Sequence, residues 1–531
     1  MEKKNKSFIM SITLVATLGG LLFGYDTAVI NGAIEALKDF FIIPLFENEE
    51  LATRVIVQFK SSVVITLIIV LVLIASFMFR LFGAVRGSIY SIILTSIIGW
   101  MLYYFLLRQP NVISETMANT INGFNNASAL IGCVIGGSIG GYISQTIGRK
   151  KGLTMAALLF TISAIGSAIP DKLLIPGTEL ITTFIIFRVI GGIGVGLASM
   201  LSPMYIAEIA PARIRGKLVS WNQFAIIFGM LVVYFVNYFI ARGQDLSWIN
   251  TVGWRWMFAS ETIPALLFFV LLFFVPETPR FLVMANKDDD AARVLKRAVG
   301  ESKTPQVLDD IKRSLQQKRL PWMSFGGLVI VIGVMLSVFQ QFVGINVVLY
   351  YASDIFRNLG LETESSLFRV ILVGIINLSF TVVAIFTVDR FGRKPLLIIG
   401  AIGMAISMFA LGFSFYFQNQ GIAALLSILF YTAAFAMSWG PITWVMLSEI
   451  FPNSIKGAMS IAVAAQWIAN WIVSLTFPVL NDSTLLTEKF HHGFSYWIYG
   501  LMGILAALFV WKFVPETKGR TLENMEQLWK K

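Results

Sequence analysis

The chain has 531 residues, of which 56% are apolar and only 13% are charged, and its mean hydropathy is +0.76. Soluble domains average about 25% charged residues, so the composition indicates an integral membrane protein. A single cysteine, Cys133, excludes an internal disulfide, and the two adjacent histidines show no metal-ligand spacing. We therefore expect no metal and no cofactor, and no catalytic dyad points to an enzyme. The net charge of +11 does not indicate nucleic-acid binding, because cytoplasmic loops of membrane proteins collect Lys and Arg.

Uncharged apolar runs of about 20 residues, enough to cross about 30 Å of hydrocarbon, recur along the whole chain. They predict an all-α polytopic membrane protein. The fourteen expected spans are 8–33, 61–79, 87–107, 122–147, 153–170, 180–206, 218–240, 257–275, 323–350, 367–388, 395–417, 422–447, 458–480 and 494–514. The first run is long enough to span and contains Asp26, so we expect it to be retained rather than cleaved as a signal peptide.

Basic residues mark alternate connections between these spans. Clusters follow the fourth span at 149–151, the sixth at 213–217 and the tenth at 390–394. Because cytoplasmic loops are enriched in Lys and Arg, we expect both termini and the long loop 276–322 to lie in the cytoplasm. That loop is amphipathic in places and is predicted to form short linking helices.

Short sequence words occur twice, about 240 residues apart. E-I-A-P-A-R-I-R-G-K at 208–217 is followed by E-I-F-P-N-S-I-K-G at 449–457, V-P-E occurs at 275–277 and 514–516, and G-R-K occurs at 148–150 and 392–394. Repeated halves in a membrane protein are typical of transporters that rock two bundles around a central site. We predict an N-terminal bundle at 1–275, a linker at 276–322 and a C-terminal bundle at 323–531.

Three of the charges within predicted spans stand out. Asp26 is the only charge between residues 7 and 34, Arg188 is alone in 181–207, and Glu261 lies near the start of the eighth span. Ionisable groups inside a membrane are costly and are functional candidates by default. The functional interpretation makes Asp26 a proton acceptor, and the alternative is a static Asp–Arg pair that holds helices together.

Amides and indoles also gather in the spans. The segment Q-Q-F-V-G-I-N at 340–346 places three amides around Gly344, where the helix can break. Similar side chains in other spans are Gln223, Trp439, Gln466, Trp467 and Asn470. Amides both donate to and accept from sugar hydroxyls, and a pocket combines such groups with apolar walls. The set predicts a polyol pocket, although any one amide could instead form an interhelical hydrogen bond.

Two further patterns concern packing and gating. Glu208 and Glu449 precede basic turns, so ion pairs there can hold one conformation shut, whereas basic residues alone would only set orientation. Glycines recur every four residues at 132, 136 and 140 and again at 192 and 196. That spacing predicts close helix packing.

Taken in order, the motifs resemble the sugar porter family of the major facilitator superfamily. They are G-G-L-L-F-G-Y-D at 19–26, R-x-x-x-G-x-G-x-G at 188–196, P-E-T-P-R at 276–280, Q-Q-x-x-G-x-N at 340–346, D-R-F-G-R-K at 389–394 and P-E-T-K-G at 515–519. The resemblance covers nearly the whole chain except about 40–118. Within the family the pattern is most similar to bacterial D-xylose–proton symporters.

The resemblance implies roles for individual residues. It implies proton coupling by Asp26, with Arg188 as its partner and Glu261 as a second acid. The implied sugar-contacting positions are Gln223, Gln340, Gln341, Asn346, Trp439 and Gln466, and the implied pocket walls are Phe23, Tyr350 and Trp467. The implied cytoplasmic charge network is Arg149, Glu208, Arg215, Glu277, Arg280, Arg393 and Glu449.

The chain departs from the family pattern at several positions. Gln145 stands where the family often has Asp, and Lys456 replaces an expected Arg, which removes bidentate geometry. Both changes are expected to loosen the cytoplasmic gate. Met230 stands where xylose symporters carry a pocket glutamine, which leaves the identity of the sugar open.

The largest departure is the segment at about 40–118, which adds the spans 61–79 and 87–107. Arg80 and Arg86 lie in the connection between them, which agrees with a cytoplasmic turn. We expect a peripheral helical hairpin, inserted between the first and second core helices and entering from the outer side. It is either a lipid-facing appendage without a transport role or a contact for a subunit or partner.

The resulting hypothesis is the import of D-xylose with a proton by alternating access, in a bacterial inner membrane and by a monomer. The partners would be a monosaccharide, a proton and the lipid bilayer. Alternatives are transport of glucose, arabinose or galactose, facilitated uniport without a titrating acid, and a non-transporting sugar sensor.

Overall fold

The computed structural model describes residues 3–211, 214–316, 320–358, 362–418, 421–451, 455, 458–518 and 529, and the regular structure there is helical. The first half contains α1 (Lys3–Phe41), α2 (Pro44–Glu47), α3 (Glu49–Leu102), η1 (Tyr103–Leu107), α4 (Glu115–Asn126), α5 (Ser128–Thr146), α6 (Arg149–Ala168), α7 (Leu180–Ile209), α8 (Arg215–Ala241), α9 (Leu246–Trp248), η3 (Ile249–Gly253), α10 (Trp254–Ser260) and α11 (Thr262–Leu272). The linker contains α12 (Pro279–Met284), α13 (Asp288–Val299), η4 (Glu301–Lys303) and α14 (Thr304–Gln316). The second half contains α15 (Gly327–Phe342), α16 (Ile345–Tyr350), α17 (Ala352–Asn358), α18 (Thr363–Phe391), α19 (Arg393–Tyr416), α20 (Ile422–Met437), α21 (Trp439–Ile450), α22 (Met459–Asn481), α23 (Thr484–Phe490) and α24 (Gly493–Phe513).

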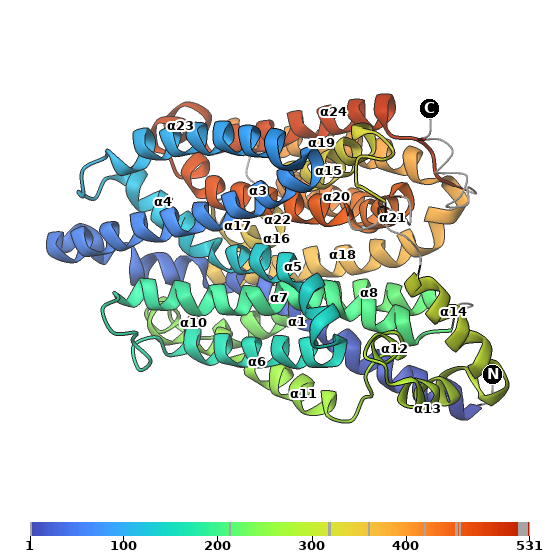
Figure 1. Cartoon of the computed structure of the whole chain (residues 1–531). Helices are drawn as coiled ribbons and strands as arrows, with labels where there is room; N and C mark the ends of the chain where they lie inside the picture. The colour runs from blue at the N-terminus through green and yellow to red at the C-terminus, as the bar shows by residue number, and fades with distance from the viewer. Residues whose placement is uncertain are drawn as a thin grey trace.

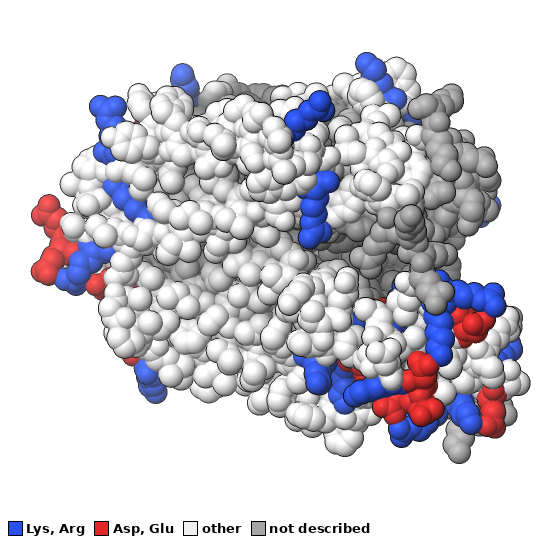
Figure 2. Space-filling model, viewed as in Figure 1, with Lys and Arg blue, Asp and Glu red and all other residues white. Residues whose placement is uncertain are grey.

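The two halves lie side by side, and most of their helices run between the same two ends of the molecule (Figure 1). Helix α1 begins and α24 ends at one end, which we call the terminal side, and the opposite end is the far side. The linker helices pack at the terminal side of the first half, where Arg297 lies 4.0 Å from the ring centre of Phe8. Most charges in the view of Figure 2 lie near the two ends, with a largely uncharged band between them, as a membrane-spanning bundle requires.

The described residues contain twelve helices that are long and apolar enough to cross a membrane, where fourteen spans were expected. One difference is the pair α4 and α5, which passes the same criteria together but bends by 43°. The other is α3, whose 54 residues contain the expected span 61–79 and most of the span 87–107, which ends in η1.

Helix α3 folds back on itself at Gly83, where the backbone leaves the helical region (φ 77°). Near the turn, a Cβ on Gly87 would lie 2.8 Å from the carbonyl oxygen of Met78. At the open end, Lys60 Nζ donates to the carbonyl of Gln109 at 2.5 Å and to Asn111 Oδ1 at 2.8 Å. The element is therefore a two-legged hairpin with its turn between Arg80 and Arg86.

Several membrane helices are interrupted near their middle. Gly344 takes a left-handed conformation between α15 and α16, Ser438 separates α20 from α21, and Glu261 separates α10 from α11. Non-helical backbone is tolerated at membrane depth only where protein or a cavity satisfies its polar groups. Each interruption carries, or stands next to, a polar residue of the predicted sites.

The glycine pattern produces the expected close packing between α5 and α7. A Cβ on Gly192 would overlap the carbonyl oxygen of Ala129, and one on Gly136 would overlap that of Ile193. The prediction of small-residue helix packing is confirmed, and it fixes the helix that carries Arg188.

We predict that Gly192→Ala lowers the stability of the purified protein, because the added methyl group forces α5 and α7 apart. Overpacking of this kind costs about 1–3 kcal/mol. The measurement is the melting temperature in detergent. Gly99→Ala is the matched control, since nothing lies within 4 Å of its Cβ position. Equal melting temperatures for the two variants would contradict the packing argument.

Candidate functional site

A carboxylate and a guanidinium meet inside the first half. Asp26 on α1 is 0% exposed and Arg188 on α7 is 1% exposed. Arg188 donates through Nη1 to Asp26 Oδ1 at 2.7 Å and through Nη2 to the Asp26 carbonyl at 3.2 Å. Its guanidinium also lies 5.1 Å from the ring centre of Phe258. The structure therefore joins two charges that are 162 residues apart in sequence.

Glu261 adds a second carboxylate to this pair. It is fully buried and close enough to Asp26 and Arg188 to interact electrostatically with both. Asp26 Oδ2 and both Glu261 oxygens lack a hydrogen-bond partner of normal geometry. If both acids are ionised, the site holds one uncompensated negative charge in a low-dielectric interior, which is costly.

A chain of buried amides crosses the second half. Gln340 Nε2 donates to the carbonyl of Trp439 at 2.9 Å and to that of Gly440 at 3.3 Å. Gln341 donates to Gln340 Oε1 at 3.4 Å, and Asn346 donates to Gln341 Oε1. In an unbroken helix, residues five apart point to different faces, so the break at Gly344 is what lets Asn346 reach Gln341.

Aromatic residues line the same region between the halves. Phe23 on α1 lies 5.6 Å, centre to centre, from Trp467 on α22. Tyr350 accepts a 3.5 Å hydrogen bond from Asn470, one turn beyond Gln466. Trp467 Nε1 and Gln466 Oε1 are buried without a partner, so one donor and one acceptor remain for a polar ligand.

Two residues predicted to contact the sugar, Trp439 and Gln223, differ from Trp467 and Gln466 in burial or in the use of their polar groups. The indole N–H of Trp439 donates to the carbonyl of Leu397 at 2.9 Å, so it is used within the protein. Gln223 on α8 is partly exposed, and its side chain forms no hydrogen bond with another described residue. Met230, also on α8, is buried where that helix packs closely on Gly24.

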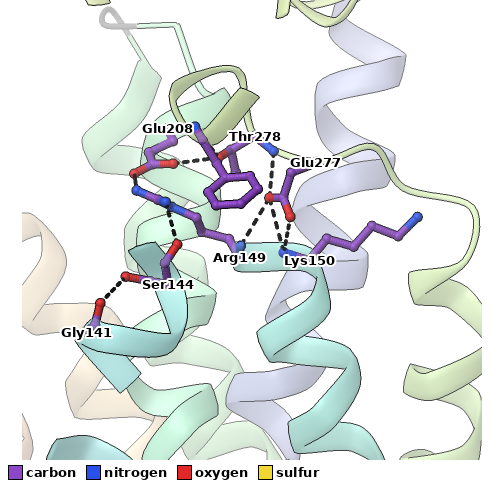
Figure 3. A network of polar contacts seen from close by, with 8 residues as sticks. Gly141, Ser144, Arg149, Lys150, Glu208, Glu277 and Thr278 are labelled. Carbon is purple, nitrogen blue, oxygen red and sulfur yellow. Dashed lines mark hydrogen bonds and ion pairs between the residues drawn. The ribbon is translucent and has the colours of Figure 1, made fainter. Parts of the chain in front are cut away.

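A network of charged groups lies at the terminal side of the first half (Figure 3). Arg149, 4% exposed, donates to Glu208 at 2.8 Å and to the carbonyl of Ser144 at 2.7 Å. Glu277 accepts from the backbone N–H groups of Arg149, Lys150 and Thr278 at 2.8–3.2 Å. The Thr278 hydroxyl completes the loop by donating to Glu208 at 2.7 Å.

The second half repeats this network. Arg393 donates to Glu449 at 3.1 Å and to the carbonyl of Val388 at 3.4 Å. Glu516 accepts from the backbone N–H groups of Arg393, Lys394 and Thr517 at 2.9–3.1 Å, as Glu277 does in the first half. The Thr517 hydroxyl donates to Glu449 at 2.5 Å. Glu516 was not among the predicted site residues, although its place in the repeated word V-P-E signalled it.

The other predicted gate residues do not join these networks. Arg215 is exposed and Arg280 is partly exposed, and neither side chain pairs with a described residue. Gln145 is exposed, and the first network forms without it. Lys456 lies outside the described residues. Both networks stay within one half, so on this side no ion pair between described residues joins the two halves.

On the far side, by contrast, charged groups connect the halves. Lys38 on α1 pairs with Asp482 after α22 at 3.3 Å, and Glu35 on α1 pairs with Arg357 on α17. Asn31 on α1 donates to the carbonyl of Leu349 at 2.9 Å. The partners of the first pair are 444 residues apart. Charges at span ends indicate only the orientation of the chain, so no sequence pattern predicts this contact.

Asp354 on α17 lies beside the Lys38–Asp482 pair. Burial and the nearby Asp482 carboxylate raise the pKa of Asp354 to about 7, and Lys38 opposes this rise. The far side is closed in this structure by the contacts of Lys38 and Glu35, and a buried carboxyl with a pKa of about 7 lies beside the first of them.

Comparisons with known proteins agree with these features. The family model described as Sugar (and other) transporter matches residues 12–529. The chain is 54% identical to the D-xylose-proton symporter of Escherichia coli (strain K12) over 539 residues, covering 99% of this chain and 96% of that protein. It is 40% identical to the glucose facilitated diffusion protein of Zymomonas mobilis, covering 100% and 99%. A solved structure of the E. coli xylose transporter, partially occluded and inward open, matches with a TM-score of 0.77 and 53% identity, covering 97% of this chain and 100% of that one.

The chain belongs to the sugar transporter family. The family predicted from the motifs is confirmed, as is the major facilitator fold. The bacterial relatives and the twelve apolar helices identify this sugar transporter as a multi-pass protein of the inner membrane.

We predict that closure of this transporter's far side weakens as pH rises from the ordinary pKa of an aspartate towards about 7, and that the effect levels off above this value. Opening hydrates Asp354, which returns its pKa towards the ordinary value, so protonation favours the closed state. The closed-to-open ratio should fall by up to about tenfold between roughly pH 6 and pH 8. The measurement is the distance between spin labels on the exposed residues Leu174 and Leu485, one in each half.

Asp354→Asn separates this effect from other titrating groups, because it removes the one carboxyl and keeps its shape. The variant should lose most of the dependence on pH between these values. An unchanged pH dependence in Asp354→Asn would assign the effect to other groups and refute the prediction.

Proposed function

We propose that this transporter imports D-xylose together with a proton by alternating access. The observation that carries the proposal is the buried set of Asp26, Arg188 and Glu261. Its position within a sugar transporter 54% identical to a D-xylose-proton symporter supports proton coupling. The rocking units are residues 1–275 and 323–531, joined by the linker 276–322.

Charge balance explains how this set couples to a proton. Two carboxylates facing one guanidinium carry one excess negative charge, and one bound proton removes it. The proton enters when the site is open to the outside. It leaves when rearrangement brings Arg188 close enough to stabilise the Asp26 anion, the arrangement in this structure.

The direction of transport follows from which side is closed. The terminal side carries the basic clusters at 149–151 and 390–394, so it is the cytoplasmic side and both termini lie there. The far side is then external. The ion pairs across the halves close it here, which supports an inward-facing state from which sugar and proton are released. The charge networks of Arg149 and Arg393 act as the cytoplasmic gate by fixing helix ends within each half.

The sugar site lies between Phe23 in the first half and the amide cluster of the second half. Trp467 Nε1 and Gln466 Oε1 supply free polar groups, and Phe23 and Tyr350 supply the apolar walls. A candidate site formed by the two halves of a single chain supports a monomer as the transporting unit.

A second candidate is facilitated diffusion of another monosaccharide, such as glucose. It is favoured by the 40% identity to a glucose facilitated diffusion protein and by Met230, which offers the pocket no hydrogen bond. Counterflow in proteoliposomes with a panel of xylose, glucose, arabinose and galactose decides the sugar. Sugar-driven alkalinisation of the medium decides between symport and uniport.

We predict that Asp26→Asn abolishes accumulation of sugar against a gradient while sparing counterflow, because the amide keeps the shape but cannot carry the proton. The measurement is uphill uptake and counterflow in the same proteoliposomes. Asp310→Asn, an exposed acid of the linker, is the control and should behave as the parent. Uphill accumulation by Asp26→Asn would refute the coupling role.

We predict that Trp467→Phe raises the KM for sugar by about 2- to 10-fold, the effect of losing one hydrogen bond. The phenyl ring retains the contact with Phe23, so the maximal rate should change little. Trp256→Phe, at a 60% exposed indole on the outer surface, is the matched control. An unchanged KM in Trp467→Phe would mean that the indole N–H does not contact the sugar.

A further inference from the structure

The α3 hairpin is fixed to the first half at its open end. Arg54 Nε pairs with Glu179 Oε1 at 2.7 Å, in the connection between α6 and α7. The side chain of Gln58 donates to the Gly177 carbonyl at 3.2 Å and accepts from the Glu179 N–H at 2.9 Å. These contacts make the open end of the hairpin part of the first half.

The two legs contact each other at the open end and near the turn. Lys60 joins them at the open end through Gln109 and Asn111. Near the turn, the rings of Phe82 and Tyr90 meet edge to face at 5.0 Å. The hairpin therefore moves as one unit with the half to which it is anchored.

The turn of the hairpin reaches Trp322, the last residue of the linker, directly before the second half. The Arg80 guanidinium lies 5.3 Å from the ring centre of Trp322, and Phe77 lies 6.4 Å from the same ring. Trp322 stands just before α15, the first helix of the second half, on the terminal side. Between the two contacts the legs are largely exposed, as at Val72 (63%) and Ile92 (64%).

The hairpin thus runs from the far side of the first half to the end of the linker on the terminal side, where the chain enters the second half. When two halves rock about a central site, the ends on each side change their separation. A rigid element anchored on one half cannot keep its contact with Trp322 through that motion. The contact belongs to the state seen here, in which the far side is closed.

We propose that the α3 hairpin is a strap that favours the state closed on the far side, through the contact of Arg80 with Trp322. An exposed cation–π contact shifts an equilibrium by about two- to fivefold. The inserted hairpin would then tune the balance between the two states of the transport cycle, besides facing lipid. The inference rests on the alternating access proposed above.

The test uses the full chain with spin labels at Leu174 and Leu485, without sugar. Arg80→Met and Trp322→Leu should each lower the closed-to-open ratio by about two- to fivefold, and the double variant should lower it no further. Arg80→Lys keeps the cation and should stay close to the parent. Arg86→Met is the matched control, because Arg86 is also exposed near the turn but lies over no described aromatic ring.

The outcomes separate the strap from the proposed function. If two distance populations are observed but Arg80→Met and Arg86→Met change their ratio equally, the strap is refuted and alternating access is retained. Double-variant effects equal to the product of the single ones would also overturn it, since Arg80 and Trp322 would then act independently. A single population in every variant would overturn both the strap and the rocking motion.

Discussion

The absence of water from the membrane interior is the constraint on which this structure depends. Every backbone polar group must be satisfied within the protein, so the chain crosses as helices and departs from helix only where protein surrounds it. The departures at Gly344 and Ser438, and the interruption at Glu261, where the backbone angles stay helical, stand at or beside the candidate sites. The break at Gly344 turns Asn346 towards Gln341, and the break at Glu261 sits beside the Asp26–Arg188 pair. In this protein, helix breaks and buried polar side chains occur together. A break leaves backbone polar groups that need hydrogen-bond partners, and it also gives a buried side chain room to reach a partner.

Charged groups pair within one half on the terminal side and between the halves on the far side. On the terminal side, Arg149 and Arg393 stand in equivalent networks, each confined to one half. On the far side, Lys38 and Asp482 connect one half to the other. Rigid halves and a connection between them at one end are what a rocking mechanism requires. The networks stiffen the moving parts, and the contacts across the halves select the state.

The equivalent networks differ in the pKa of their carboxyl groups. Burial raises the pKa of Glu277, against the backbone N–H groups that donate to it. At the less buried Glu516, burial acts in the same direction but the backbone N–H donors outweigh it, so the pKa is lowered. The repeated sequence word therefore keeps the same hydrogen-bond pattern in both halves, while the degree of burial sets the direction of the pKa shift.

Hydropathy, repeated words and isolated charges in the sequence predict the membrane fold, the two halves and most residues of the candidate sites. Hydropathy and repeated words are local, so they can be read without coordinates, and isolated intramembrane charges such as Asp26 stand out against apolar neighbours. Only the tertiary structure decided which groups meet. It pairs Glu208 with Arg149, leaves Arg215 without a described partner, and brings Lys38 to Asp482 across 444 residues. It also shows where the hairpin reaches, since the contact of Arg80 with Trp322 follows from the packing of both halves. Ion pairs form between residues that the fold places within a few ångströms, and no local pattern in a sequence encodes that distance.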